Sequence, residues 1–349
     1  MKKQILFCFL TLSIMIACNP QETKTNKMPV TGKIAIALHG GAGNIEKMNL
    51  SEEEKKAYLH VMDSALSVGY EFLKTGGSSV DAVEKVLCVL EDSPLFNAGR
   101  GSVFSHDGKI EMDAAIMDGK TLDAGCLAGV RHIKNPISLA KLIMRKSNTV
   151  FLHGEGAESF ATEKGMSLVD TSYFFTQERW DQLQNALKKD SGMELDHGNE
   201  EKASGKNEKT EGKYGTVGCV AMDQNGNLAA GTSTGGLVNK KYNRIGDSPI
   251  IGAGTYAENL VGAISCTGRG EDFIKNVIAY DIASQIKYQN KSLFDAVSAS
   301  IQTKLKSNGG RGGCIAMDHE GNIVFNFTTT GMFRGSIDTN GKKYTAIYR

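Results

Sequence analysis

Thr216 follows Gly215 where a highly charged segment meets a run of small and β-branched residues. A threonine hydroxyl is a weak nucleophile that needs a neighbouring base. If the peptide bond between Gly215 and Thr216 breaks, the new α-amino group has a reference pKa of about 7.7–8.0 and can accept the hydroxyl proton near neutral pH. Glycine also tolerates the torsions of a strained bond. The pair predicts a self-activated threonine nucleophile, although it also suits the plain start of a strand.

A serine hydrolase is the competing chemical interpretation. Residues 231–235, GTSTG, fit the G-x-S-x-G nucleophile elbow, and His39 begins an HGGA sequence similar to an oxyanion motif. The elbow serine, here Ser233, must be followed by a helix. The next residues, GLVNKKYNRIGDSP, lack helical periodicity, and the only histidine downstream is His319, in a predicted hairpin turn. The serine hydrolase is therefore kept as a remote alternative.

Helices and strands occur in runs around these residues. The patterns predict strands over 33–44, 150–154, 216–223 and 228–236, and helices over 51–74, 79–90, 135–145, 155–164, 272–288 and 293–306. The first helix opens with a capping box, Ser51 to Glu54. GCVAMDQNGNL (218–228) is similar to GCIAMDHEGNI (313–323), which indicates two related hairpins.

Grouped strands and paired helices favour an α+β fold of antiparallel sheets covered by helices over βαβ alternation. A charged linker, about residues 187–215, lies between the two runs of elements. We expect it to divide one domain rather than to separate two, because each half alone has unpaired strands.

The N-terminus has the layout of an export signal. Lys2 and Lys3 precede an apolar stretch from Ile5 to Ala17, which is short for a bilayer span. The Ile-Ala-Cys sequence ending at Cys18 resembles the lipobox of bacterial lipoproteins. We expect a signal peptide over 1–17, lipidation of Cys18, a polar tether over 18–32, and a membrane-anchored protein on the periplasmic side. Ordinary secretion is the alternative.

The composition limits the remaining classes. The net charge is +1 without a long basic run, which argues against nucleic-acid binding. No zinc or redox spacing links the seven cysteines. Five of them lie in apolar or small-residue runs and are predicted to be buried free thiols: Cys88, Cys126, Cys219, Cys266 and Cys314. No cofactor is expected for catalysis.

Several long motifs resemble one known family. They are HGGAG (39–43), FNAGRGSVF (96–104), EMDAAIMDG (111–119), AGCLAGVRHIKNP (124–136), the run from Gly215 to Asn259, and ISCTGRGE (264–271). Together they are similar to plant-type asparaginases, also called isoaspartyl peptidases, which are N-terminal-nucleophile hydrolases. The resemblance covers residues 33–349 as a single domain.

This resemblance implies a four-layer αββα sandwich and a precursor cut between Gly215 and Thr216. The products would be an α chain, 18–215, and a β chain, 216–349, which stay associated as an αβ heterodimer and pair into a dimer of heterodimers. The implied substrates are small molecules: the side-chain amide of asparagine and β-aspartyl dipeptides.

The resemblance also implies roles for individual residues. Thr216 would be the nucleophile, assisted by Thr234, with Thr232 beside Thr234. Arg244 and Asp247 would bind the α-carboxylate and α-ammonium groups of the substrate, since a guanidinium pairs with a carboxylate in two-pronged fashion. The other implied residues are Thr267 and Gly268 as the oxyanion site, Gly270 beside the substrate amino group, Asn97 near the active site, and Arg269 as a candidate for leaving-group preference.

A structural sodium ion is implied for the loop that contains Asn97. Backbone carbonyl oxygens suit hard cations. The implied ligands are Leu90, Glu91, Ser93, Phe96, Ala98 and Arg100. A glycine-rich turn without an ion is the alternative.

Two other functions remain open. Glycosylasparaginases, a neighbouring branch, typically have Asp before the threonine and Asn in the TST segment, whereas this chain has Gly215 and Gly235-Gly236. A lipid-anchored binding protein that lost catalysis would require the loss of a matched residue, and none is lost.

Overall fold

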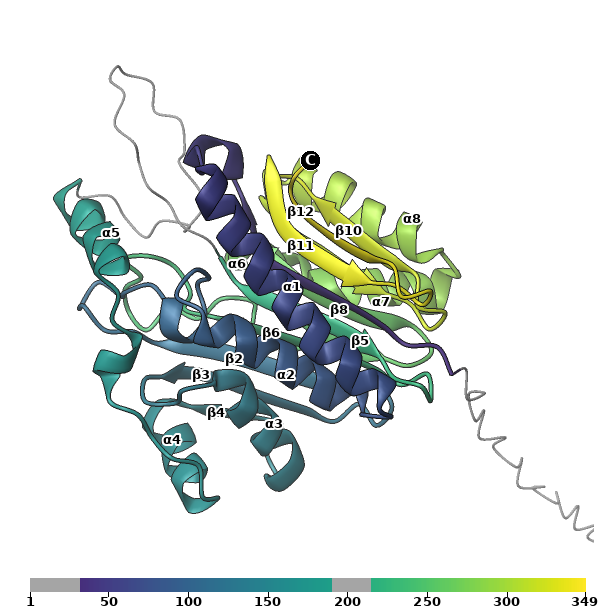
Figure 1. Cartoon of the computed structure of the whole chain (residues 1–349), viewed down its shortest axis with the longest axis horizontal. Coiled ribbons are helices and arrows are strands. Elements are labelled where there is room, and N and C mark those ends of the chain that lie inside the picture. Colours follow the sequence, from purple (N-terminus) through teal and green to yellow (C-terminus); the bar gives the residue numbers. More distant parts are fainter. Residues whose placement is uncertain (1–31, 190–214) are drawn as a thin grey trace, which may run out of the picture.

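The computed structural model describes residues 32–189 and 215–349 (Figure 1). The predicted signal peptide, Cys18 and most of the linker lie outside these ranges. Within the described residues, no helix combines the length and apolar character that a bilayer crossing requires.

The larger sheet has eight strands in the order β12-β11-β1-β5-β6-β2-β3-β4. Its strands are β1 (Ala35–Gly43), β2 (Met112–Asp118), β3 (Ala124–Val130), β4 (Phe151–His153), β5 (Val217–Met222), β6 (Leu228–Thr234), β11 (Gly331–Ile337) and β12 (Lys343–Tyr348). The β3–β4 pair is parallel, and the other pairs of this sheet are antiparallel. Strand β1 lies between β5 and β11, so both halves of the sequence build the centre of one domain.

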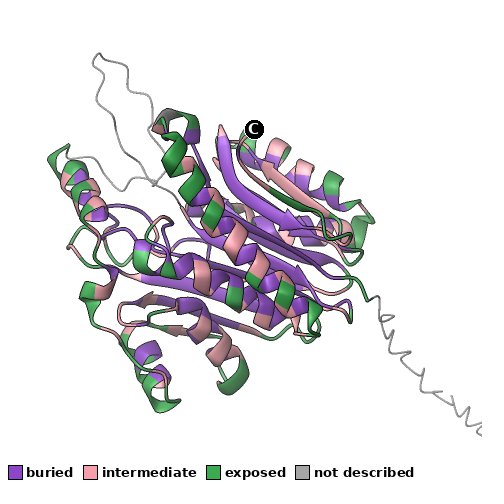
Figure 2. Ribbon diagram, viewed as in Figure 1, coloured by how far each residue is buried: buried purple, intermediate pink, exposed green. Residues whose placement is uncertain are grey.

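The smaller sheet packs face to face on the larger one. It has the order β10-β9-β8-β7, with β7 (Thr255–Glu258), β8 (Gly262–Gly268), β9 (Gly312–Met317) and β10 (Ile323–Phe327). Alternate residues of β1 separate two cores: Ile36 and Leu38 pack under helices, whereas Ala37 packs between the sheets. Both faces of the central strands are therefore buried, as the colouring in Figure 2 shows.

Helices cover the outer face of each sheet. Over the larger sheet lie α1 (Glu52–Lys74), α2 (Ser79–Asp92) and α3 (Pro136–Lys146), and against the smaller sheet lie α6 (Gly270–Asn276), α7 (Ile278–Gln289), α8 (Leu293–Ser298) and the π-helix η4 (Ala299–Leu305). Outside these layers are α4 (Gly154–Glu163), α5 (Gln177–Lys188) and the 3₁₀ turns η1 (Ile45–Met48), η2 (Gly99–Gly101) and η3 (Thr171–Phe174). The arrangement confirms the α+β prediction and the four-layer αββα sandwich.

The capping residues predicted the start and the end of helix α1 correctly. The side chain of Ser51 accepts a hydrogen bond from the N–H of Glu54, and the Glu54 carboxylate accepts one from the N–H of Ser51, which completes the predicted capping box. The helix ends before Gly76 and Gly77, because glycine adopts the positive φ of 88° at position 76 without strain.

The predicted helix over 272–288 is wrong in one respect, because it breaks at Val277. This residue has φ 48° and ψ 49°, in the left-handed region that β-branched residues disfavour. The break lets the first N–H groups of α7 bond to a loop of the smaller sheet, since the N–H groups of Ala279 and Tyr280 donate to the carbonyls of Ala253 and Gly252. Periodicity alone gives no sign of this tertiary bond.

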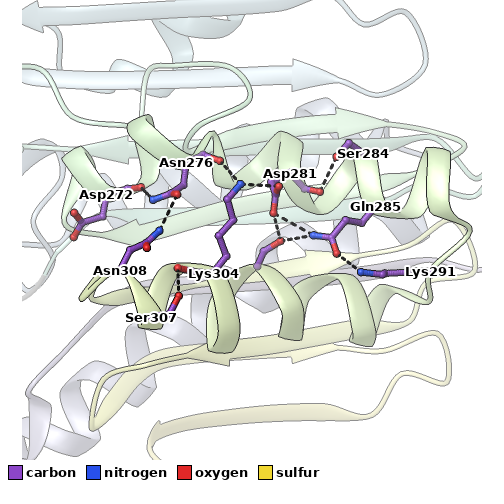
Figure 3. Close-up of polar contacts among 10 residues, drawn as sticks. Asp272, Asn276, Asp281, Ser284, Gln285, Lys291, Lys304, Ser307 and Asn308 are labelled. Atoms are coloured by element: carbon purple, nitrogen blue, oxygen red, sulfur yellow. Dashed lines mark hydrogen bonds and ion pairs between the residues drawn. The ribbon is translucent and has the colours of Figure 1, made fainter.

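The last predicted helix, 293–306, is also divided. It begins as α8 and continues as the π-helix η4, which a polar cluster joins to α7 (Figure 3). The Asp281 carboxylate of α7 accepts hydrogen bonds from Lys304 Nζ at 2.8 Å and from Ser300 Oγ at 2.6 Å. Ser300 and Lys304 are four residues apart, so one turn of η4 places both donors over the same carboxylate.

Both similar hairpins are present, one in each sheet: β5–β6 in the larger and β9–β10 in the smaller. Helix α5 was not predicted; Thr176 caps its first turn, and Arg179 within it is 2% exposed.

Candidate active site

Thr216 lies immediately before β5, at the end of the sandwich where β6 finishes. Val217 pairs with Ser233, so Thr216 is placed opposite Thr234. The Thr216 hydroxyl donates a hydrogen bond to Thr234 Oγ1 at 3.2 Å, and Thr216 is only 7% exposed. Thr234 Oγ1 also accepts from the N–H of Gly236 at 3.0 Å. The turn after β6 thus holds the Thr234 hydroxyl beside the predicted nucleophile.

His39 on β1 fixes the backbone of Thr216, a role that the sequence analysis missed. Its Nδ1 lies 3.0 Å from the Thr216 carbonyl oxygen, and its Nε2 lies 3.0 Å from Ser265 Oγ. Burial lowers the pKa of His39 to about 3, so the ring is neutral. A carbonyl oxygen can only accept, so Nδ1 carries the proton and the Ser265 hydroxyl donates to Nε2.

The hydrogen-bond chain continues from Ser265 across both sheets. Ser265 Oγ lies 2.7 Å from Thr232 Oγ1, and Thr255 donates to Thr232 Oγ1 at 2.6 Å. Gly218 makes room for this chain, because a Cβ at that position would collide with both His39 and Ser265. Thr232 therefore supports the site through Ser265, and no hydrogen bond joins it to the Thr216 hydroxyl within the described part of the chain.

The predicted oxyanion residues lie at the end of β8, on the facing sheet. Thr267 is 1% exposed, and its Oγ1 accepts a hydrogen bond from the N–H of Ala42 at 3.3 Å. The hydroxyl proton of Thr267 remains available as a donor, because a hydroxyl has one proton and two lone pairs. Strand β1 contacts both Thr216, through His39, and Thr267, so the two lie at the same end of the sandwich.

Arg244 does not pair with Asp247 in this structure. Its guanidinium makes a two-pronged ion pair with Glu271, with Nε to Oε1 and Nη2 to Oε2 both at 2.9 Å. Arg269 is half-exposed and lies 3.9 Å from the same carboxylate. Glu271 was not singled out from the sequence, although it ends the SCTGRGE motif. A substrate carboxylate must therefore compete with Glu271 for Arg244.

Asp247 has a buried carboxylate, and one of its oxygens is free to accept a hydrogen bond from a ligand. It is 3% exposed, and its Oδ2 has no hydrogen-bond partner among the described residues. Burial raises the pKa of Asp247 to about 7, against the opposing effect of Arg244. Gly270 lies against both residues, since a Cβ there would come within 2.6 Å of Arg244 Nη2 and 2.9 Å of the Asp247 nitrogen. This geometry suits an incoming ammonium group.

Asn97 shapes the turn that holds Thr234. Its Nδ2 donates to the Gly236 carbonyl at 2.8 Å, and its Oδ1 accepts from the N–H of Val103 at 3.0 Å. The Asn97 carbonyl also accepts from the N–H of Gly235. Asn97 thus lies next to the site, with both ends of its amide bound to the backbone.

Ser233 faces away from this site, which contradicts the serine-hydrolase alternative. Its hydroxyl donates to Glu91 Oε1 at 2.6 Å on the helix side of the sheet, and the residue is fully buried. Burial raises the pKa of Glu91 to about 8, so this carboxyl group is mostly protonated at neutral pH and is a poor general base. No histidine hydrogen-bonds to Ser233 in the described ranges.

The loop from Leu90 to Arg100, where a sodium ion is expected, is tightly curled. Gly99 and Gly101 allow it to curl tightly, because a Cβ at either position would collide with the carbonyl oxygens of Glu91 and Phe96 respectively. The carbonyls of Leu90, Phe96 and Ala98 accept hydrogen bonds within the loop. Backbone carbonyl oxygens are the donor type that a hard cation needs, and the sodium ion stays a prediction for this loop.

The five predicted thiols are free, as expected from the sequence. Four are buried and Cys88 is partly buried. Burial raises the pKa of Cys126 and Cys314 to about 12, so neither thiol is reactive.

Comparison with known proteins agrees with this geometry. Residues 32–347 match the family model Asparaginase_2, described as asparaginase. An isoaspartyl peptidase of Escherichia coli (strain K12) is 45% identical over 318 residues, which cover 91% of this chain and 97% of that protein. The isoaspartyl peptidase/L-asparaginase of Rattus norvegicus is 38% identical over 339 residues, which cover 95% and 96% of the two chains. The chain therefore belongs to the asparaginase family, as the motifs had indicated.

Proposed function

We propose that this chain is a self-processing isoaspartyl peptidase and L-asparaginase. The observation that carries the proposal is the environment of the Thr216 hydroxyl, which hydrogen-bonds to another hydroxyl and to no basic side chain among the described residues. An N-terminal α-amine would supply the missing base. The family assignment and the names of the relatives support the substrate class.

The proposed first step is an intramolecular cleavage. The Thr216 hydroxyl attacks the carbonyl carbon of Gly215, the amide nitrogen of Thr216 leaves as an amine, and water hydrolyses the resulting ester. His39 holds the Thr216 carbonyl during this step, and Thr234 orients the hydroxyl. The products are the α chain ending at Gly215 and the β chain beginning at Thr216.

The proposed catalytic cycle uses the new amine as the base. It takes the hydroxyl proton while Oγ1 attacks the β-carbonyl carbon of the substrate, and the oxyanion is held by the Thr267 hydroxyl and the Gly268 N–H. Such a donor typically contributes about 10²–10³ in rate. The ammonium then gives its proton to the leaving nitrogen, and water hydrolyses the β-aspartyl ester.

Substrate orientation would come from the charged pair beside the site. Arg244, released from Glu271, would bind the α-carboxylate, and the unpaired oxygen of Asp247 would accept from the α-ammonium. Both interactions are charge-assisted, and the second satisfies a buried acceptor.

A denaturing gel and a substrate panel test this function. Purified wild-type protein should give two fragments on incubation, whereas Thr216→Ala should stay whole. The processed enzyme should release aspartate from asparagine and from β-Asp-Leu. A wild-type chain that remains intact and hydrolyses neither compound would refute the proposal, and glycosylasparagine as the best substrate would move the protein to the glycosylasparaginase branch.

We further propose a sodium ion in the loop from Leu90 to Arg100, export with lipidation at Cys18, and assembly as a dimer of αβ heterodimers. The curled carbonyl-rich loop supports the ion. The lipobox-like sequence supports the anchor. Labelled palmitate on Cys18 and the mass of the processed protein in solution test the last two.

A further inference from the structure

A cavity of about 470 Å³ is lined by Arg244 and by residues of β2, β3 and α4. We name it the polar cavity, after Lys109, Asp113, Arg131, His153 and Lys240 in its lining. Asp113 on β2 pairs with Thr234, whose hydroxyl holds that of Thr216. Asp113 therefore lies level with Thr216 in the sheet, with β6 between their strands. Of its lining residues, only Arg244 has a role assigned above.

The Asp113 carboxylate gives the polar cavity an acceptor that needs a ligand. Asp113 is 1% exposed, and its Oδ1 accepts from the N–H of Gly129 at 2.9 Å. Its Oδ2 has no hydrogen-bond partner in the described parts of the chain. The neighbouring Lys240 ammonium instead donates to the carbonyls of Glu111 and Gly235. A buried carboxylate oxygen without a donor is costly, so an ammonium ligand would stabilise it.

The Arg131 guanidinium supplies the opposite charge. It makes no ion pair or side-chain hydrogen bond with the residues that the structure describes, and its Nε is buried without a partner. Lys109 lines the cavity beside it. An unpaired guanidinium is suited to a carboxylate, which it can bind with two parallel hydrogen bonds.

A second cavity of about 290 Å³ adjoins the polar cavity through the same two cations, because Arg131 and Lys109 line both. We name it the aromatic cavity, after Phe104, Phe175 and Trp180. The Phe104 ring lies edge-on to Trp180 at 5.2 Å and to Phe175 at 5.9 Å. These rings offer apolar surface next to a carboxylate-binding group.

We propose that the two cavities together bind the amino acid that leaves when a β-aspartyl dipeptide is hydrolysed. Asp113 accepts from its amino group, Arg131 and Lys109 bind its carboxylate, and the aromatic cavity takes its side chain. Hydrolysis breaks the β-amide C–N bond, and the released nitrogen becomes an ammonium, which strengthens its bond to Asp113. The enzyme therefore prefers dipeptides whose second residue is aromatic or large and aliphatic.

This inference rests on the proposed function, and asparagine provides an internal control. Its leaving group is ammonia, which reaches neither Arg131 nor the aromatic cavity. In the processed wild-type enzyme, kcat/KM for β-Asp-Phe should exceed that for β-Asp-Gly by about tenfold or more, as burial of a phenyl group allows. Turnover of asparagine should be independent of Arg131 and of the aromatic cavity.

Two variants test the carboxylate-binding group and the aromatic cavity separately. Arg131→Met should lower kcat/KM for both dipeptides by about tenfold, the typical effect of losing a hydrogen bond to a charged group, and leave asparagine unchanged. Trp180→Ala should reduce the preference for β-Asp-Phe over β-Asp-Gly. Arg145→Met, on the exposed end of α3, is the matched control and should change neither ratio. Phenylalanine should also bind the processed wild-type enzyme in a calorimeter and bind Arg131→Met more weakly.

The outcomes separate the inference from the proposed function. An enzyme that hydrolyses asparagine but shows no preference between the dipeptides overturns the pocket and leaves the function standing. If Arg131→Met lowers asparagine turnover as much as dipeptide turnover, Arg131 serves the aspartyl half or the fold, and the pocket is again refuted. Hydrolysis of none of these compounds overturns the proposed function itself.

Discussion

The His39 ring makes two hydrogen bonds, and the substitutions His39→Asn and His39→Gln test them one at a time. The amide nitrogen of an asparagine at position 39 would lie near the place of Nδ1, which donates to the Thr216 carbonyl. The amide of a glutamine would lie near the place of Nε2, which bonds to Ser265. We expect His39→Asn to keep most of the activity and His39→Gln to lose it, because Thr216 is the proposed nucleophile.

The magnitude follows from burial. The bond to the Thr216 carbonyl is 3.0 Å long, and His39 is fully buried, so water cannot replace the lost donor. A buried acceptor left unsatisfied costs about 1–3 kcal/mol. If this cost applies fully in the transition state, kcat falls by about 5- to 150-fold.

The assay is aspartate release from asparagine, with kcat and KM determined separately, and a gel time course for processing. Thermal unfolding of both variants is the control for stability. Equal kcat values for His39→Asn and His39→Gln, or an effect on KM alone, would show that the bond to Thr216 does not position the nucleophile.

Three further changes probe the neighbours of this bond. Ser233→Ala should leave turnover intact but lower the free energy of unfolding by about 1–3 kcal/mol in denaturant titration, because Glu91 loses a buried donor; loss of turnover without loss of fold would revive the serine hydrolase. Glu271→Gln should lower KM several-fold in steady-state kinetics, since Arg244 then no longer pairs with a charged carboxylate; an unchanged or higher KM would contradict this competition. Asp247 has a raised pKa of about 7, so its binding-competent charge appears as pH rises, and kcat/KM should increase through about pH 7; the profile of Asp247→Asn should lose this limb, and an unaltered profile would assign it to another group.

The N-terminal nucleophile could be predicted because its chemistry is local. Thr216 needs only an adjacent cleavable bond to gain a base, and Gly215 stands next to it. The capping box at Ser51 and the turn between β5 and β6 are equally local, and the structure has both where the sequence predicts them. Together with long motifs, such signals were sufficient for the family and the layered fold.

The side chains at the end of β6 could not be oriented from the sequence. Ser233 and Thr234 must point to opposite faces, because successive side chains of a strand alternate. Which face meets Thr216 depends on the pairing of β6 with β5, and which face meets Glu91 depends on the packing of α2. The sequence already favoured the threonine, but only the tertiary structure shows that Thr234 faces Thr216 and that Ser233 faces Glu91.

The sequence by itself determined the candidate nucleophile, the family, the α+β class and most helix boundaries, since each rests on neighbouring residues or contiguous motifs. Only the tertiary structure decided that His39 hydrogen-bonds to the Thr216 carbonyl, 177 positions away, and that Arg244 forms an ion pair with Glu271. It also decided that Asp113 and Arg131 border one cavity. Such contacts arise when strands and helices from distant segments pack, and no local propensity specifies them.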